Sequence, residues 1–229
     1  MKLLAFETST EACSVALWLD GALHERFELA PRRHAELALP WAEALLAEAG
    51  VAKAQLDAIA TGRGPGAFTG VRLGVAIAQG IALALDRPVV PVSTLAALAL
   101  PAAGERILAA IDARMGEVYL AAFGREGDGL RLLQAEAVVA PGAAALPEGD
   151  GWHGVGTGFA AADGALPARF GARLASVDAG ALPHAADVAR LAVAAFARGE
   201  AVAPERLEPA YLRDNVALTL AEQQGRRGS

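Results

Sequence analysis

The sequence has few of the residues that bind metals or form disulfides. Its single cysteine, Cys13, leaves no partner for an internal disulfide and no thiolate set for a zinc cluster. Its four histidines are dispersed, and no two lie at the close helical spacing of zinc or iron ligands. There is no Gly-x-Ser-x-Gly nucleophile elbow. These shortages argue against a protein metal site, a metallopeptidase and a serine hydrolase, and we expect Cys13 to lie in the core.

Long uninterrupted hydrophobic runs are also lacking, although 54% of the residues are hydrophobic. The apolar run at residues 75–85 is broken by Gln79 and Gly80, and none reaches the roughly 18–20 residues of a membrane span. Glu7 and Glu11 interrupt the N-terminal run before a signal-peptide core of about 7–15 residues forms. We therefore expect a cytoplasmic protein with a substantial core.

Positive charge is scarce, since the formal net charge is −6 at pH 7. A chain that binds nucleic acid by itself needs clustered lysine and arginine side chains to neutralise the phosphates. We therefore expect any role on RNA to be shared with another protein.

The first half of the chain alternates between strand and helix patterns. Residues 3–6, 13–19 and 22–29 read as three strands, with a hairpin signal at Asp20-Gly21. The helical period predicts helices at residues 34–49, closed by Gly50, and 71–85. The remaining predicted elements are strands at 56–61 and 89–92 and a helix through residue 100, capped by Ser93 or Thr94. An antiparallel meander followed by alternating strands and helices predicts an α/β fold with a mixed sheet.

The second half repeats this opening. An apolar run at residues 107–111 ends in Asp112, and a polar turn leads to a strand at 117–123. The repeat predicts a duplication with lobes at residues 1–102 and 103–229, although short hairpins are common enough for chance to compete. Beyond it we expect a turn at 124–129, a surface loop or short helix at 140–151, a helix at 184–198 and an extended tail at 204–214.

The most conspicuous motif is a glycine-rich loop, Gly64-Pro65-Gly66-Ala67-Phe68-Thr69-Gly70, between a predicted strand and a predicted helix. Backbone N–H groups at a helix N-terminus can cradle an anion. No Gly-Lys-Ser/Thr follows, so the loop is not a P-loop. The alternative is a tight turn that lets the following helix pack closely against a neighbour, and both interpretations stay open.

One face of the helix at 71–85 carries almost no side chains. Gly70, Gly74 and Ala78 are four residues apart, which permits close approach by another helix, inside the fold or from a second subunit. Together with the neighbouring helix this predicts a subunit interface formed by His34, Leu37, Trp41, Leu45, Gly70, Val71, Gly74, Val75 and Ala78.

An acidic residue follows the first predicted strand in each of the two lobes. Glu7 and Asp112 would hold a nucleotide's magnesium ion if they faced each other across a cleft, and we place Thr8 with them as a candidate nucleotide-binding residue. The alternative is a turn residue in each case.

Six stretches, in order along nearly the whole chain, resemble motifs of the TsaB (YeaZ) family. They are residues 6–17 (FETSTEACSVAL), 34–36 with 39–40 (HAE, LP), 64–74 (GPGAFTGVRLG), 91–98 (PVSTLAAL), 111–114 with 116–119 (IDAR, GEVY) and 209–213 (PAYLR). Each is weakly specific alone, whereas six in register are highly specific. One departure is Glu7, where relatives commonly carry aspartate.

The resemblance implies a two-lobed actin-like, Hsp70-like fold in which each lobe resembles ribonuclease H. It implies a non-catalytic subunit of the complex that transfers a threonylcarbamoyl group to N6 of adenosine 37, in tRNAs reading codons that begin with A. The implied partners are the catalytic subunit TsaD, bound through the N-terminal lobe, and the ATPase TsaE. We expect no cofactor on this chain, ATP and magnesium to be used by its partners, and a homodimer when it is isolated.

A stand-alone small-molecule kinase is the alternative, because the actin-like fold hosts many kinases. Their phosphate loops typically carry several glycines with Asp and Thr in both lobes. In this chain the second lobe offers only residues 112–116.

Overall fold

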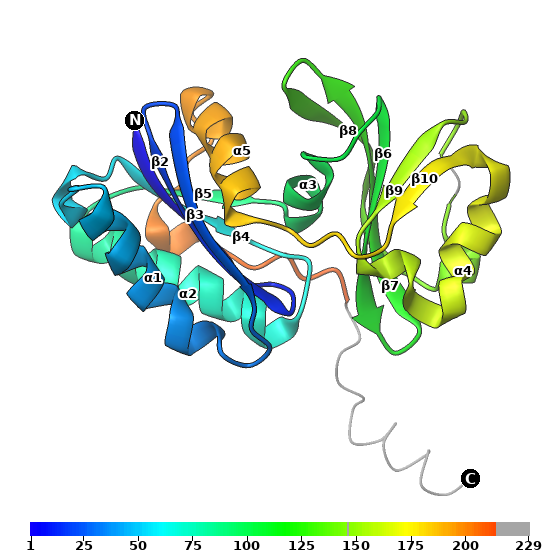
Figure 1. Ribbon diagram of the computed structural model, residues 1–229, viewed down its shortest axis with the longest axis horizontal. Coiled ribbons are helices and arrows are strands. Elements are labelled where there is room, and N and C mark those ends of the chain that lie inside the picture. The colour runs from blue at the N-terminus through cyan, green and yellow to red at the C-terminus, as the bar shows by residue number, and fades with distance from the viewer. Residues whose placement is uncertain (146, 214–229) are drawn as a thin grey trace, which may run out of the picture.

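The computed structural model describes residues 1–145 and 147–213. The last 16 residues of the predicted second lobe, 214–229, lie outside the described part, and they include the final residue of the predicted tail at 204–214. The described residues form two five-stranded sheets, one on each side of a pair of central helices (Figure 1).

The first sheet has the strand order β3-β2-β1-β4-β5. β1 (Lys2–Glu7), β2 (Ala12–Leu19) and β3 (Ala22–Leu29) form the predicted antiparallel meander. β4 (Ala58–Gly62) and β5 (Val89–Val92) then extend it in parallel with β1. The mixed sheet is thereby confirmed.

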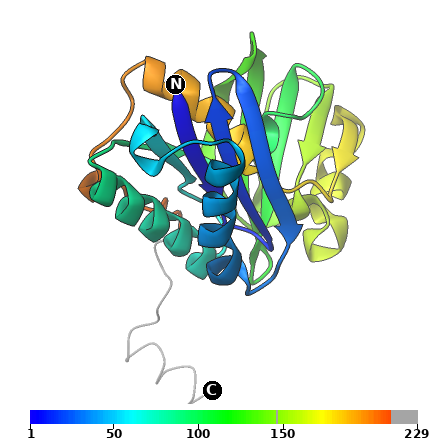
Figure 2. The ribbon, with the colours of Figure 1, turned by 60° about the vertical axis from the view of Figure 1, so that its left-hand side comes forward.

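Two helices cover one face of this sheet, α1 (His34–Glu48) and α2 (Phe68–Leu85) (Figure 2). Because side chains alternate along a strand, Leu4 and Phe6 of β1 pack with these helices, while Leu3 and Ala5 face the other side. Cys13 is fully buried, as expected, in the core between the sheet and these two helices.

The second sheet repeats the first in order and direction. β6 (Arg106–Arg114), β7 (Glu117–Glu126) and β8 (Gly129–Val139) are antiparallel, and β9 (Trp152–Val155) and β10 (Leu174–Asp178) continue in parallel. Read from the edge at β8, the strand order is β8-β7-β6-β9-β10, which corresponds strand for strand to β3-β2-β1-β4-β5 of the first sheet. This correspondence confirms the predicted repeat. Helix α4 (Ala161–Phe170) covers one face. Short 3₁₀ helices lie at Lys53–Gln55, Pro141–Ala143, Thr157–Phe159, Gly171–Arg173 and Pro204–Arg206.

The helix that follows the fifth strand of each sheet crosses to the other sheet. α3 (Thr94–Ala99) packs through Leu95 and Leu98 on β6 and β7, while α5 (Ala185–Ala197) packs through Val188 on the first sheet. Ser93 caps α3 as predicted, accepting a hydrogen bond from the backbone N–H of Ala96 at 3.1 Å. The predicted boundary at residues 102 and 103 therefore separates the two sheets, whereas α5 joins the first sheet.

Polar contacts reinforce this exchange. The carboxylate of Glu136 on β8 accepts hydrogen bonds from Ser93 and, at 3.1 Å, from Arg63, which lies just after β4. The imidazole of His184, before α5, pairs with Glu25 on β3, and this hydrogen bond raises the pKa of His184. The lobes are thus held together by side chains as well as by the crossing helices.

Candidate functional site

The glycine-rich loop packs against the turn between β1 and β2. The backbone N–H of Ala67 donates to the Ser9 carbonyl at 2.7 Å, and the hydroxyl of Thr8 donates to the Gly70 carbonyl at 2.7 Å. A Cβ at Gly66 would lie 2.7 Å from that of Ser9, and one at Gly70 would overlap the Thr8 carbonyl oxygen. The close-packing interpretation is therefore the one that the structure supports. α2 begins at Phe68, three residues earlier than predicted, so the end of the loop is helical.

The small-residue face of α2 points inward, which corrects the predicted interface. A Cβ at Gly74 would lie 2.7 Å from the Thr8 hydroxyl oxygen and 3.0 Å from that of Thr61 on β4. Gly70 and Ala78 are buried on the same face. The small residues let the helix approach its own sheet, and they are not available to a second chain.

The other predicted interface residues also serve the first lobe itself. Val71, Val75 and Leu45 are buried, while Leu37 and Trp41 are half-buried against the core between α1 and the sheet. His34 holds the start of α1 to the β1–β2 turn, because its Nε2–H donates to the carbonyls of Thr10 at 3.0 Å and Ala12 at 3.1 Å. Val71, Val75 and Leu45 thus pack in the lobe's own core, while a partner contact at the half-buried His34, Leu37 and Trp41 stays a prediction.

The exposed side of α2 carries a second stripe of small residues. Ala76, Gly80 and Ala84 are four residues apart and all exposed, and a Cβ at Gly80 would meet nothing within 4 Å. Leu83 beside them is 55% exposed, and Leu39 on the neighbouring α1 is 47% exposed. We call Ala76, Gly80, Leu83 and Ala84 of α2 the outer helix face. Its spacing was readable in the sequence, but the sequence does not say which stripe faces the sheet.

Helix α2 is also long and apolar enough, by length and composition, to cross a membrane. Its buried residues nevertheless pack on β1 and β4 of the first sheet. The fold thus accounts for the helix's hydrophobic inner side.

Glu7 lies inside the first lobe. Its side chain is 1% exposed and accepts hydrogen bonds from the Ser9 backbone at 2.7 Å, from the Ser9 hydroxyl, and from the Thr94 hydroxyl at 3.2 Å. Burial outweighs these bonds and raises the pKa of the carboxyl. Gly62 leaves the space that this side chain fills, since any Cβ there would overlap it. Thr8 is likewise buried, so neither side chain reaches the cleft.

Glu7→Gln is expected to remove a pH dependence of stability. Because the folded-state pKa of Glu7 is raised, the free energy of unfolding should fall as pH rises from 4.5 through that pKa and then level off. Glutamine keeps the volume, accepts from Ser9 and donates to Thr94, so the variant should be at least as stable as wild type above that range. Urea midpoints of both proteins at successive pH values test this. A marked loss of stability in Glu7→Gln at neutral pH would show that the ionised carboxylate is needed.

Asp112 lies two residues before the end of β6, at the wall of the cleft between the lobes, where its carboxylate is paired with Arg114 on the same strand. Its carboxylate accepts from the Arg114 backbone at 2.8 Å and from the Arg114 guanidinium at 2.9 Å. In the described part of the chain no three His, Cys, Asp or Glu side chains gather to hold a metal ion. With Glu7 buried and Asp112 paired, the predicted residues do not fit a magnesium–nucleotide complex.

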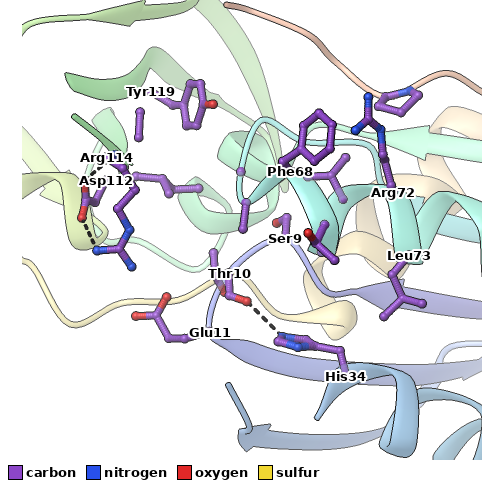
Figure 3. Close-up of a pocket in the computed structure, with 18 of the residues that line it drawn as sticks. Ser9, Thr10, Glu11, His34, Phe68, Arg72, Leu73, Asp112, Arg114 and Tyr119 are labelled. Carbon is purple, nitrogen blue, oxygen red and sulfur yellow. Dashed lines mark hydrogen bonds and ion pairs between the residues drawn. The ribbon is translucent and has the colours of Figure 1, made fainter. Parts of the chain in front are cut away.

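A cavity of about 790 Å³ opens between the lobes (Figure 3), and we call it the inter-lobe cavity. Ser9, the end of the glycine-rich loop and the start of α2 line it from the first lobe, and Asp112 and Tyr119 line it from the second. The charged side chains that line it, among the residues the structure describes, are Arg32, Arg72, Arg114, Arg213, Glu11 and Asp112.

Sheet order, crossing helices and cavity together define a two-lobed actin-like protein whose lobes each resemble ribonuclease H. A family model described as "TsaD: tRNA N6-adenosine threonylcarbamoyltransferase" matches residues 27–220. The chain belongs to the TsaB (YeaZ) family of tRNA threonylcarbamoyladenosine biosynthesis proteins.

Three relatives show the extent of the similarity. The TsaB protein of Escherichia coli is 44% identical over 95% of this chain and 96% of its own length. That of Haemophilus influenzae is 40% identical over 94% of this chain and 95% of its own length. The solved structure of YeaZ from Pseudomonas aeruginosa is 47% identical, with a TM-score of 0.84 over 92% of this chain and 99% of its own. The likeness therefore spans both lobes.

Proposed function

We propose that the chain is the non-catalytic, dimerising subunit of a complex that transfers a threonylcarbamoyl group to N6 of adenosine 37 in tRNAs reading codons that begin with A. The observation that carries the proposal is the outer helix face, an apolar surface on the first lobe that the chain's own fold leaves exposed. The family to which the chain belongs supplies the reaction. The chemistry itself belongs to the partner, TsaD, and ATP with magnesium is used by TsaD and the ATPase TsaE.

The β1–β2 turn supports an accessory role over the kinase alternative. A phosphate loop must present free backbone N–H groups to the ligand. In this chain the turn is buried under Gly66 and Gly70, and the N–H of Ser9 is bonded to Glu7. The first lobe therefore offers little to a triphosphate.

The outer helix face also gives the isolated chain a route to a homodimer. Ala76 and Gly80 let a facing helix approach closely, whether it belongs to TsaD or to a second copy. We propose that the two compete for one surface, in the cytoplasm, where tRNA modification takes place.

Mixing the purified chain with TsaD should yield a heterodimer at the expense of the homodimer. Size-exclusion chromatography with light scattering measures both masses. A mixture that elutes as two separate proteins at micromolar concentration would contradict the proposal.

A further inference from the structure

The wall of the inter-lobe cavity combines exposed aromatic rings with arginines. The guanidinium of Arg72 lies 3.3 Å from the ring centroid of Phe68 and 5.2 Å from that of Tyr211, and it donates to the Tyr211 hydroxyl at 2.9 Å. Phe68 and Tyr211 are each more than half exposed, while Tyr119 lies across the cavity (Figure 3). Exposed rings and guanidinium planes at a cavity are surfaces on which unpaired bases stack.

Two further arginines carry charge to the same opening. Arg32 is exposed in the turn before α1, and the side chain of Arg114, the last residue of β6, is 83% exposed with one guanidinium nitrogen bonded to Asp112. They belong to different lobes and line one cavity. Among the described lining residues, Arg114 is paired with Asp112 and Arg213 with Glu117, so Arg32 and Arg72 face only the carboxylate of Glu11 and leave a net positive charge in a chain that is acidic overall. The cavity is therefore a local site for an anion.

The volume and the chemistry together select the ligand. About 790 Å³ lies within the range of pockets that hold one nucleotide-sized molecule. A magnesium-bound triphosphate would need free carboxylates for the metal and free backbone N–H groups for the phosphates. In this chain the carboxylates of Glu7 and Asp112 and the backbone N–H of Ser9 are already hydrogen-bonded within the protein. A nucleotide within an RNA strand needs only stacking and single-phosphate contacts, which this wall offers.

We propose that the inter-lobe cavity binds an unpaired nucleotide of the tRNA, with its base against the exposed rings and the flanking phosphates on Arg32 and Arg114. This inference rests on the proposed function, because that function supplies the RNA. The site lies at the N-terminal end of α2, whereas the outer helix face occupies Ala76 to Ala84, so the chain presents tRNA and TsaD with separate surfaces.

The test is tRNA binding by the complex of this chain with TsaD. Both arginines have positive φ, so Arg32→Asn and Arg114→Asn remove the charge with a residue that tolerates this conformation. The double variant should weaken tRNA binding about tenfold or more and lower the salt slope of the affinity by about one to two. Arg131→Gln, at an exposed position on β8, removes a charge elsewhere and should leave binding unchanged.

The outcomes separate this inference from the proposed function. If wild-type complex binds and modifies tRNA while the double variant binds it equally well, the cavity is not an RNA site. If the double variant no longer associates with TsaD, the cavity is a protein contact and the inference is overturned. If free ATP binds the isolated chain tightly and the double variant alone loses that binding, the ligand is a free nucleotide. Failure of the wild-type complex to modify tRNA would instead count against the proposed function.

Discussion

Gly70→Ala should destabilise the protein by about 3 kcal/mol, the upper part of the usual range for overpacking. The added methyl group would overlap the Thr8 carbonyl oxygen. The methyl carbon is held by the backbone of a helix, and the oxygen belongs to the backbone of a tight turn. Neither can turn aside as a flexible side chain would, so α2 or the β1–β2 turn must move. Urea unfolding followed by circular dichroism measures the change.

Gly80→Ala is the matched control, because it adds the same methyl group to the same helix. At Gly80 a Cβ meets nothing within 4 Å, so alanine should stabilise the protein by about 0.5–1 kcal/mol through its helix propensity. Equal effects of the two substitutions would contradict the assignment of the inner and outer sides of α2.

Gly80→Arg should abolish association with TsaD without destabilising the isolated chain. The new side chain projects from an exposed position into open space, so the folded monomer accommodates it. In the complex it would place a bulky charge where a facing helix must approach closely, which desolvates the charge and forces the helices apart. We expect at least a hundredfold loss of affinity, or about 2.7 kcal/mol, by calorimetry, with an unchanged melting temperature.

Two variants make this result specific. Ala172→Arg adds the same charge at an exposed position of the second lobe and should bind TsaD normally. Gly74→Arg would place a large side chain on the buried face of α2, where it would overlap Thr8 and Thr61. This variant should unfold the protein, so a loss of binding to TsaD would not locate the interface. Normal binding by Gly80→Arg would move the interface elsewhere.

Much of the first lobe was predictable because its elements carry strong local signals. The Asp20-Gly21 turn fixes the hairpin between β2 and β3, and the helical period with Gly50 fixes α1. The repeat at residues 107–123 led to the second lobe. Weaker elements were missed, among them β8, where Gly129 to Val139 is only partly buried and lacks a clear alternation.

The site was harder to predict because it depends on which side of an element faces the core. α2 carries two stripes of small residues at the same spacing, and only tertiary packing shows that Gly70, Gly74 and Ala78 face the sheet. Glu7 stands at the end of its strand, as a metal-binding carboxylate would, but Gly62 opens a space inside the lobe that it fills. The crossing of α3 and α5 between sheets leaves no sequence signal either.

The most direct test of the central claim is a reconstituted modification assay with an activated threonylcarbamoyl donor and unmodified tRNA, in which the modified nucleoside is quantified by mass spectrometry. TsaD, TsaE and ATP with wild-type chain should yield modified tRNA. The chain alone should yield none, and Gly80→Arg in its place should yield little more than a reaction without it. Modification by the chain alone, or full modification without it, would contradict an accessory subunit that acts through its outer helix face.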